Sequence, residues 1–125
     1  MATWADLAHD NRGAAKELRD GGRHRSSCNR AYYAAYCAVA SVLEGQVDFG
    51  YGGNNPTHEQ LEPLILNNLY SLSKNERYEL RKSVRRLRTI RILADYVPAE
   101  AVDEAITLQA GRDVRQVFKI LGIKT

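Results

Sequence analysis

The sequence predicts a single all-α domain, an up-down helical bundle of four to five helices. Three observations lead to this class. Apolar residues recur at three- and four-residue spacing in several long segments, capping patterns precede some of these segments, and apolar–polar alternation never extends beyond a few residues. The chain has 125 residues, 44% of them hydrophobic, which suits one core of ordinary domain size. We therefore expect residues 1–125 to form one domain.

The first two helices follow from apolar spacing and glycine. A helix is expected over residues 4–19 and ends at Asp20-Gly21-Gly22, because glycine readily adopts the left-handed conformation that terminates helices. Ser26 or Ser27 is expected to cap a second helix that runs to about Leu43. This helix is apolar on most of its circumference and rich in alanine, which predicts a place in the middle of the bundle.

Two further helices begin with capping boxes. Residues 44–56, with four glycines, are expected to form a loop. Thr57-x-x-Gln60 then opens a short third helix that ends near Asn68, with Pro63 predicting a kink or a later start. Ser73-x-x-Glu76 opens a long fourth helix.

The end of the chain supplies the last helix. The fourth helix is expected to end near Tyr96, and Pro98 suits the first turn of a fifth helix, which Gly122 ends.

Composition argues against several classes of protein. No apolar run approaches the length of a membrane span, and the first residues lack the pattern of a secretory signal, so we expect a cytoplasmic protein without a membrane partner. Cys28 and Cys37 lie nine residues apart in one predicted helix, roughly 13 Å at about 1.5 Å per residue, so they are expected to be free and buried. No motif indicates a metal site or a cofactor.

The charge is unevenly distributed. The net charge is only +3, but residues 74–91 carry eight cations against two glutamates, hence +6, and the rest of the chain carries −3. Such a helix favours binding of nucleic acid or of nucleotide phosphates, although a solvated helix face is the simpler interpretation. The predicted basic face comprises Arg77, Arg81, Lys82, Arg85 and Arg86.

A second set of polar residues should lie at the edge of the core. Arg88, Arg91 and Asp95 follow one another at spacings of three and four and therefore share a helix face. Arg30 and Tyr33 lie on the predicted central helix. Two interpretations stay open: a structural polar network between the two helices, or a groove whose guanidinium groups accept phosphates.

The same segments resemble a known family. The run from Asn29 to Leu43, with Arg-Ala-Tyr-Tyr-Ala-Ala, is similar to one helix of HEPN domains. Thr57-His58 after the loop and the segment from Leu87 to Tyr96, which ends in Ala-Asp-Tyr, are also similar to this family. The resemblance covers roughly residues 5–121. It implies a helical bundle that commonly forms homodimers, with members that bind or cleave RNA in toxin–antitoxin or defence systems beside a nucleotidyltransferase partner.

The chain departs from the family at the catalytic motif. Active nucleases of the family carry Arg-x(4–6)-His near the end of the long helix, whereas here Asp95 and Tyr96 follow the arginines and no histidine lies beyond His58. Arg19 and His24 match the spacing, but two glycines between them break the helix. We therefore expect an RNA- or nucleotide-binding module without the usual nuclease chemistry. A dimeric interaction protein that pairs with a nucleotidyltransferase is the alternative, and an atypical ribonuclease is the second alternative.

Overall fold

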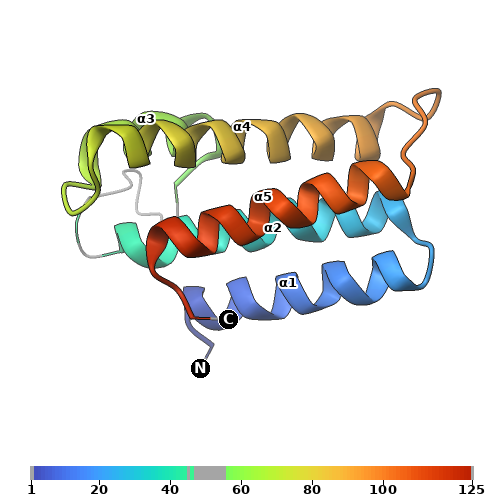
Figure 1. The fold of residues 1–125 in the computed structure, drawn as a ribbon, viewed down its shortest axis with the longest axis horizontal. Helices are drawn as coiled ribbons and strands as arrows, with labels where there is room; N and C mark the ends of the chain where they lie inside the picture. The colour runs from blue at the N-terminus through green and yellow to red at the C-terminus, as the bar shows by residue number, and fades with distance from the viewer. Residues whose placement is uncertain (1, 45, 47–55, 125) are drawn as a thin grey trace.

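The computed structural model describes residues 2–44, 46 and 56–124, and this part of the chain contains five helices and no strand. The predicted all-α fold is therefore confirmed (Figure 1). In chain order the helices are α1 (Trp4–Asp20), α2 (His24–Leu43), α3 (His58–Asn68), α4 (Lys74–Tyr96) and α5 (Glu104–Leu121).

The four long helices run alternately in opposite directions, as in an up-down bundle (Figure 1). The α3 and α4 helices form one side of the molecule, α2 and α5 lie in the middle, and α1 forms the opposite side. Among the described residues, no helix combines the length and the apolar composition needed to cross a membrane.

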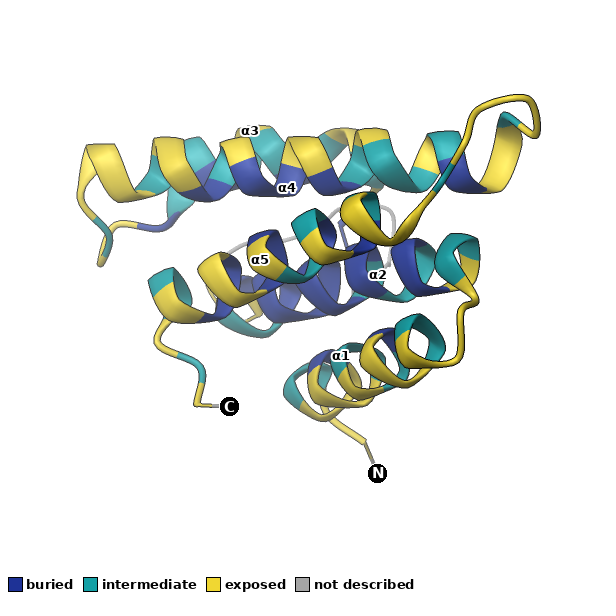
Figure 2. Ribbon diagram, turned by 45° about the vertical axis from the view of Figure 1, so that its right-hand side comes forward, coloured by how far each residue is buried: buried dark blue, intermediate teal, exposed yellow. Residues whose placement is uncertain are grey.

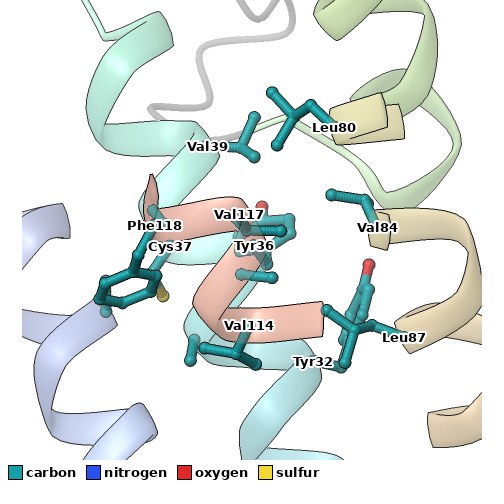
Figure 3. Close-up of a cluster of buried hydrophobic side chains, with 14 of the residues drawn as sticks. Tyr32, Tyr36, Cys37, Val39, Leu80, Val84, Leu87, Val114, Val117 and Phe118 are labelled. Carbon is teal, nitrogen blue, oxygen red and sulfur yellow. The ribbon is translucent and has the colours of Figure 1, made fainter. Parts of the chain in front are cut away.

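The α2 helix forms the centre of the core, as its composition predicted. Its buried residues include every position from Ala34 to Ala40, and it packs against all four other helices (Figure 2). Its many alanines allow the neighbouring backbones to approach closely. Figure 3 shows side chains of α2, α4 and α5 that meet in this core: Tyr32, Tyr36, Cys37, Val39, Leu80, Val84, Leu87, Val114, Val117 and Phe118.

Both predicted capping boxes are present. The Thr57 and Ser73 hydroxyls accept hydrogen bonds from the backbone N–H groups of Gln60 and Glu76, whose side chains accept in return from the two cap N–H groups. Pro63 lies inside α3, which nevertheless begins at His58, so a later start of this helix was the wrong alternative.

The predicted cap of α2 is wrong. The helix begins at His24 after Arg23, which forms no side-chain cap. The turn before it is closed by Gly22, with a φ of 78°, and by the Arg23 N–H, which donates to the Leu18 carbonyl at 2.8 Å. The hydroxyl of Ser27 instead donates to the Ala15 carbonyl at 2.7 Å. This serine therefore joins α2 to α1 in the interior rather than capping a helix.

The predicted start of α5 is also wrong. Pro98 lies in a turn before the helix, and the N-cap is Asp103, whose carboxylate accepts from the Ile106 N–H at 3.1 Å. The end of α5 agrees with expectation, since Gly122 has a φ of 72° in the left-handed region that glycine favours.

Both cysteines are free and buried, as predicted. Burial raises the pKa of the Cys28 thiol to about 11, so this group is a neutral core residue at physiological pH. Most of the predicted glycine-rich loop, residues 45 and 47–55, lies outside the described residues.

Candidate functional site

A cluster of tyrosine, arginine and histidine side chains lies where α2, the start of α3 and the second half of α4 meet. Its centre is Arg91, whose guanidinium carbon lies 5.9, 5.6 and 5.4 Å from the ring centroids of Tyr32, Tyr33 and Tyr96. Its Nη2 lies 3.5 Å from the Tyr33 hydroxyl and 3.4 Å from the Tyr96 hydroxyl. A cation above several aromatic faces is stabilised by their quadrupoles, so this arginine is held in a defined position.

A chain of polar contacts fixes the other side of Arg91. Its Nε lies 2.9 Å from Oδ2 of Asp95, one helical turn further along α4. The same carboxylate oxygen accepts a 2.8 Å hydrogen bond from the Asn29 amide. Asn29 in turn accepts from Arg30 Nε at 2.9 Å, and Arg30 Nη1 donates to Asn11 of α1 at 2.9 Å. Asn29 therefore joins the predicted site residues Arg30 of α2 and Asp95 of α4, and Asn11 connects Arg30 to α1.

The charge balance around Arg91 favours its cationic form. Burial lowers the pKa of Arg91, but Tyr33, Tyr96 and Asp95 together outweigh burial, so the pKa is raised above its usual value. The side chain is 16% exposed. The arginine is therefore permanently charged, oriented by Asp95 and still reachable from solvent.

Arg88 lies beside this cluster with weaker attachments. Its Nη1 lies 3.4 Å from the His58 carbonyl, and its Nη2 lies 3.7 Å from a carboxylate oxygen of Glu59. The Glu59 side chain is 80% exposed and the Arg88 side chain 30%. An ion pair of this length with a solvated partner contributes little, so the Arg88 guanidinium is available to another anion.

His58 lies among the aromatic rings of α2. Its ring centroid is 5.5, 5.9 and 5.3 Å from those of Tyr32, Tyr33 and Tyr36, and its Nδ1 lies 2.6 Å from the Tyr32 hydroxyl. Burial, and then the positive charges of Arg91 and Arg88, lower the pKa of His58. Burial also raises the pKa of Tyr32. At neutral pH both side chains are therefore uncharged.

This environment predicts a pH dependence of stability. Because the pKa of His58 is lower in the folded than in the unfolded protein, the unfolded state binds more protons at pH values between the folded pKa and about 6.5. The contribution of neutral His58 to the free energy of unfolding is therefore fully present at pH 7 and should be lost as the pH falls through this window. In the variant His58→Gln, the loss of unfolding free energy between pH 7 and pH 5, measured in urea, should be smaller than in the wild type. Equal losses would show that His58 does not titrate differently in the folded state.

Two of the five residues of the basic face of α4 pair with carboxylates of other helices. Arg86 forms two hydrogen bonds of 2.9 Å to the buried carboxylate of Asp113 on α5, which raises the pKa of Arg86. Arg85 Nε lies 2.9 Å from Glu62 of α3. These two carboxylates, together with those of Glu59 and Asp95, offset four of the six net positive charges of residues 74–91. The net charge that remains is +2.

The remaining cations of the predicted basic face lie on the first half of α4. Lys82 lies 3.9 Å from Glu79 in the same helix, and the Arg81 guanidinium lies 5.4 Å from the Tyr78 ring centroid. Arg77 is half-buried on the preceding turn. These groups extend the positive charge away from Arg88 and Arg91 rather than completing their cluster.

One arginine with an important position was not anticipated. Arg25 of α2 donates to the carbonyls of Ala94, Val97 and Pro98 at 3.1, 3.3 and 3.1 Å, and also to the Glu100 carbonyl. It therefore satisfies acceptors at the carboxyl end of α4 and in the turn that follows. No spacing rule pairs it with a segment about 70 residues away, so no sequence signal indicated this contact.

The cluster offers the chemistry of an anion site rather than of a metal site. Guanidinium groups donate paired N–H groups to phosphate oxygens in a forked geometry, and Tyr96, which is 65% exposed, can stack on a base. Among the described residues, no group of three or more histidine, cysteine, aspartate or glutamate side chains is arranged to hold a metal ion.

Comparison with protein families agrees with this architecture. The model of the HEPN domain matches residues 1–124. No curated protein and no solved structure matched the chain. The match extends over essentially the whole sequence and includes the α2, α3 and α4 segments that build the cluster. The chain therefore belongs to the HEPN domain family.

Proposed function

We propose that this protein binds the phosphate groups of RNA, or of a nucleotide, with Arg88 and Arg91 at the cluster where α2, α3 and α4 meet. The observation that carries the proposal is the contrast between the two arginines. Arg91 is oriented by Asp95 and three tyrosine rings, whereas Arg88 has only long contacts and is 30% exposed. A fixed cation beside an available one suits an anion that arrives from solvent.

His58 and Tyr96 complete the proposed site. When Nδ1 of neutral His58 accepts from Tyr32, the ring carries its proton on Nε2 and can donate it to a phosphate oxygen. Tyr96 supplies an exposed aromatic face for a nucleobase. Membership in the HEPN family supports a nucleotide-related role, since the resemblance implies members that bind or cleave RNA.

The test is RNA affinity of an Arg88→Gln variant, measured by fluorescence anisotropy with a single-stranded RNA of about 20 nucleotides at about 50 mM salt. Loss of a charge-assisted contact should weaken binding roughly tenfold. It should also reduce the slope of log affinity against log salt by about one. Because Arg88 has only weak partners, the unfolding free energy should change by less than about 1 kcal/mol.

Lys119→Gln provides the matched control, since it removes one exposed positive charge from α5. We expect this variant to bind RNA nearly as well as the wild type. Equal affinities of the two variants would contradict the proposal, as would undetectable binding of the wild type at micromolar concentration.

A specific observation favours ribonuclease activity as a second candidate. His58 is brought beside Arg88 from a different helix, so an arginine and a histidine adjoin without the usual linear motif. In the tautomer whose Nδ1 donates to the Tyr32 hydroxyl, Nε2 of neutral His58 is unprotonated and can act as a general base. Cleavage of a structured RNA that disappears in His58→Ala but persists in His9→Ala would support this role, and cleavage unaffected by His58→Ala would exclude the residue.

We also propose a homodimer in the cytoplasm, within a toxin–antitoxin or defence system that includes a nucleotidyltransferase partner. The family resemblance supports this setting. Exposed aromatic residues near and on α4, among them Tyr70 at 79% and Tyr78 at 46% exposure, offer contact surface. Light scattering during size exclusion tests the dimer, and a monomer at about 100 µM would contradict it.

A further inference from the structure

A groove lined by residues of α1, α2 and α5 lies between α1 and α5, and it is separate from the site proposed above. Of these helices, α1 lies on the side of the molecule opposite α3 and α4 (Figures 1 and 2). The volume of the groove is about 700 Å³. The buried Ala15, Ala31 and Val114 contribute apolar surface to its lining. Gly13 of α1 and Gly111 of α5 also line it. A Cβ on Gly13 would meet nothing within 4 Å, whereas the space beside Gly111 is taken by the Arg19 guanidinium.

The cations of this groove lack the compensation found on α4. Five basic side chains line it, with His9 beside them, and no aspartate or glutamate belongs to its described lining. The basic residues are Arg12, Lys16, Arg19, Arg112 and Arg115. On α4, by contrast, Arg85, Arg86 and Arg91 each lie 2.9 Å from a carboxylate oxygen. Uncompensated cations around a concave surface concentrate positive potential where a small anion would enter.

Arg12 carries a buried N–H donor that an anion in the groove could satisfy. Its Nη1 is buried and has no hydrogen-bond partner among the described residues. Its guanidinium carbon lies 4.8 Å from the Phe118 ring centroid, which holds the side chain in the groove. Burial, and then repulsion by Arg115, lower the pKa of Arg12. A buried donor without an acceptor is costly, and a ligand oxygen would remove that cost.

Arg19 crosses from α1 towards α5. Its Nη1 lies 3.0 Å from the position that a Cβ would occupy on Gly111, so the glycine permits this close approach. Its ion pair with Asp20 is long, at 3.9 Å. The Arg19 guanidinium is therefore held over the groove without a strong partner.

We propose that the groove between α1 and α5 binds a small phosphate ester whose remaining part is flat or apolar. The guanidinium-rich rim would hold the phosphate, because arginine presents paired donors to its oxygens, and the apolar lining would cover the body of the ligand. The volume lies within the range of small-molecule pockets, roughly 300–1,000 Å³. It corresponds to only about six residues of a helix about 10 Å wide, so a small ligand fits better than a docked helix.

The proposal can be tested by titrating the full chain with ADP and, separately, with inorganic pyrophosphate, using backbone amide NMR. ADP presents phosphates and a flat base, whereas pyrophosphate presents charge alone. The Gly13 and Gly111 amide signals should shift with saturation, and ADP should bind several-fold more tightly than pyrophosphate. Equal affinities would contradict the role of the apolar lining. If neither probe binds at millimolar concentration, the proposed site is wrong. The same conclusion would follow if an acidic peptide, titrated in the same way, bound while ADP and pyrophosphate did not.

Two variants test the location. Lys16→Ala with Arg115→Ala removes two exposed rim charges and should raise the dissociation constant for ADP at least about tenfold. Gly13→Leu should abolish binding by filling the groove, since a Cβ at this position meets nothing within 4 Å and leucine favours a helix. Unchanged circular dichroism and thermal unfolding would show that both variants fold.

The charge-matched control is Lys119→Ala with Lys124→Ala, two exposed lysines outside the groove lining. We expect this control to bind ADP like the wild type, and equal weakening of both double variants would overturn the proposal. RNA affinity should be the same in the two double variants. Loss of ADP binding in the groove variants alone, with RNA binding still sensitive to Arg88→Gln, would separate the two sites.

Discussion

Replacing Arg86, whose side chain is 46% exposed, with methionine is expected to reduce the unfolding free energy by about 3 kcal/mol, the scale of leaving a buried carboxylate without its donors. The reason lies in Asp113, whose side chain is only 4% exposed and whose two carboxylate oxygens both accept from Arg86. Methionine retains much of the apolar stem but leaves this carboxylate buried and unpaired. Urea unfolding at pH 7 measures the loss.

The neighbouring Arg85→Met variant is a matched control. Arg85 is 60% exposed and its partner Glu62 is also accessible to solvent, so its removal should change stability by less than about 1 kcal/mol. Equal losses for the two arginine variants would contradict the distinct role of Asp113.

Replacing Arg25 with alanine is expected to cost about 2–3 kcal/mol, the scale of losing charge-assisted hydrogen bonds at a helix end. This side chain joins α2 to the carboxyl end of α4 and to the turn before α5. In its absence, the carbonyls of Ala94 and Val97 lose their contact with a cation. Urea unfolding gives the change in free energy, and amide hydrogen exchange should increase near the end of α4.

Two other variants distinguish this capping role from a general effect of charge. Arg25→Lys keeps the charge but cannot reach several carbonyls at once, so it should retain only part of the stability. Arg23→Ala removes an exposed arginine without a side-chain cap bond and should have little effect. A loss in Arg23→Ala equal to that in Arg25→Ala would contradict the proposed origin of the stabilisation.

Local patterns were sufficient for most of the fold. The capping boxes at Thr57 and Ser73 and the left-handed Gly122 are short-range features, and each was found where the sequence indicated. Ser27 had the residue type of a cap but uses its hydroxyl to bind α1. The role of Ser27 depends on how α1 packs against α2, and the local sequence does not contain that information.

The candidate site was predictable only within single helices. The spacing from Arg91 to Asp95 placed both residues on one helix face, and in the structure they form an ion pair at 2.9 Å. Contacts between helices depend on how the helices pack, so Asn29, Glu62 and Asp113 could not be assigned as partners beforehand. For the same reason, the positive charge of α4 looked larger along the sequence than it is in the folded protein.

The proposed function requires that Arg88 and Arg91 contact RNA phosphates. The most direct measurement is an NMR titration of the arginine Nε–Hε signals of the full chain with a short single-stranded RNA. We predict that the signals of these two arginines shift and saturate together with the binding curve, while that of the exposed Arg23, which belongs to neither proposed site, changes little. Unshifted signals of Arg88 and Arg91 at saturating RNA would contradict the account.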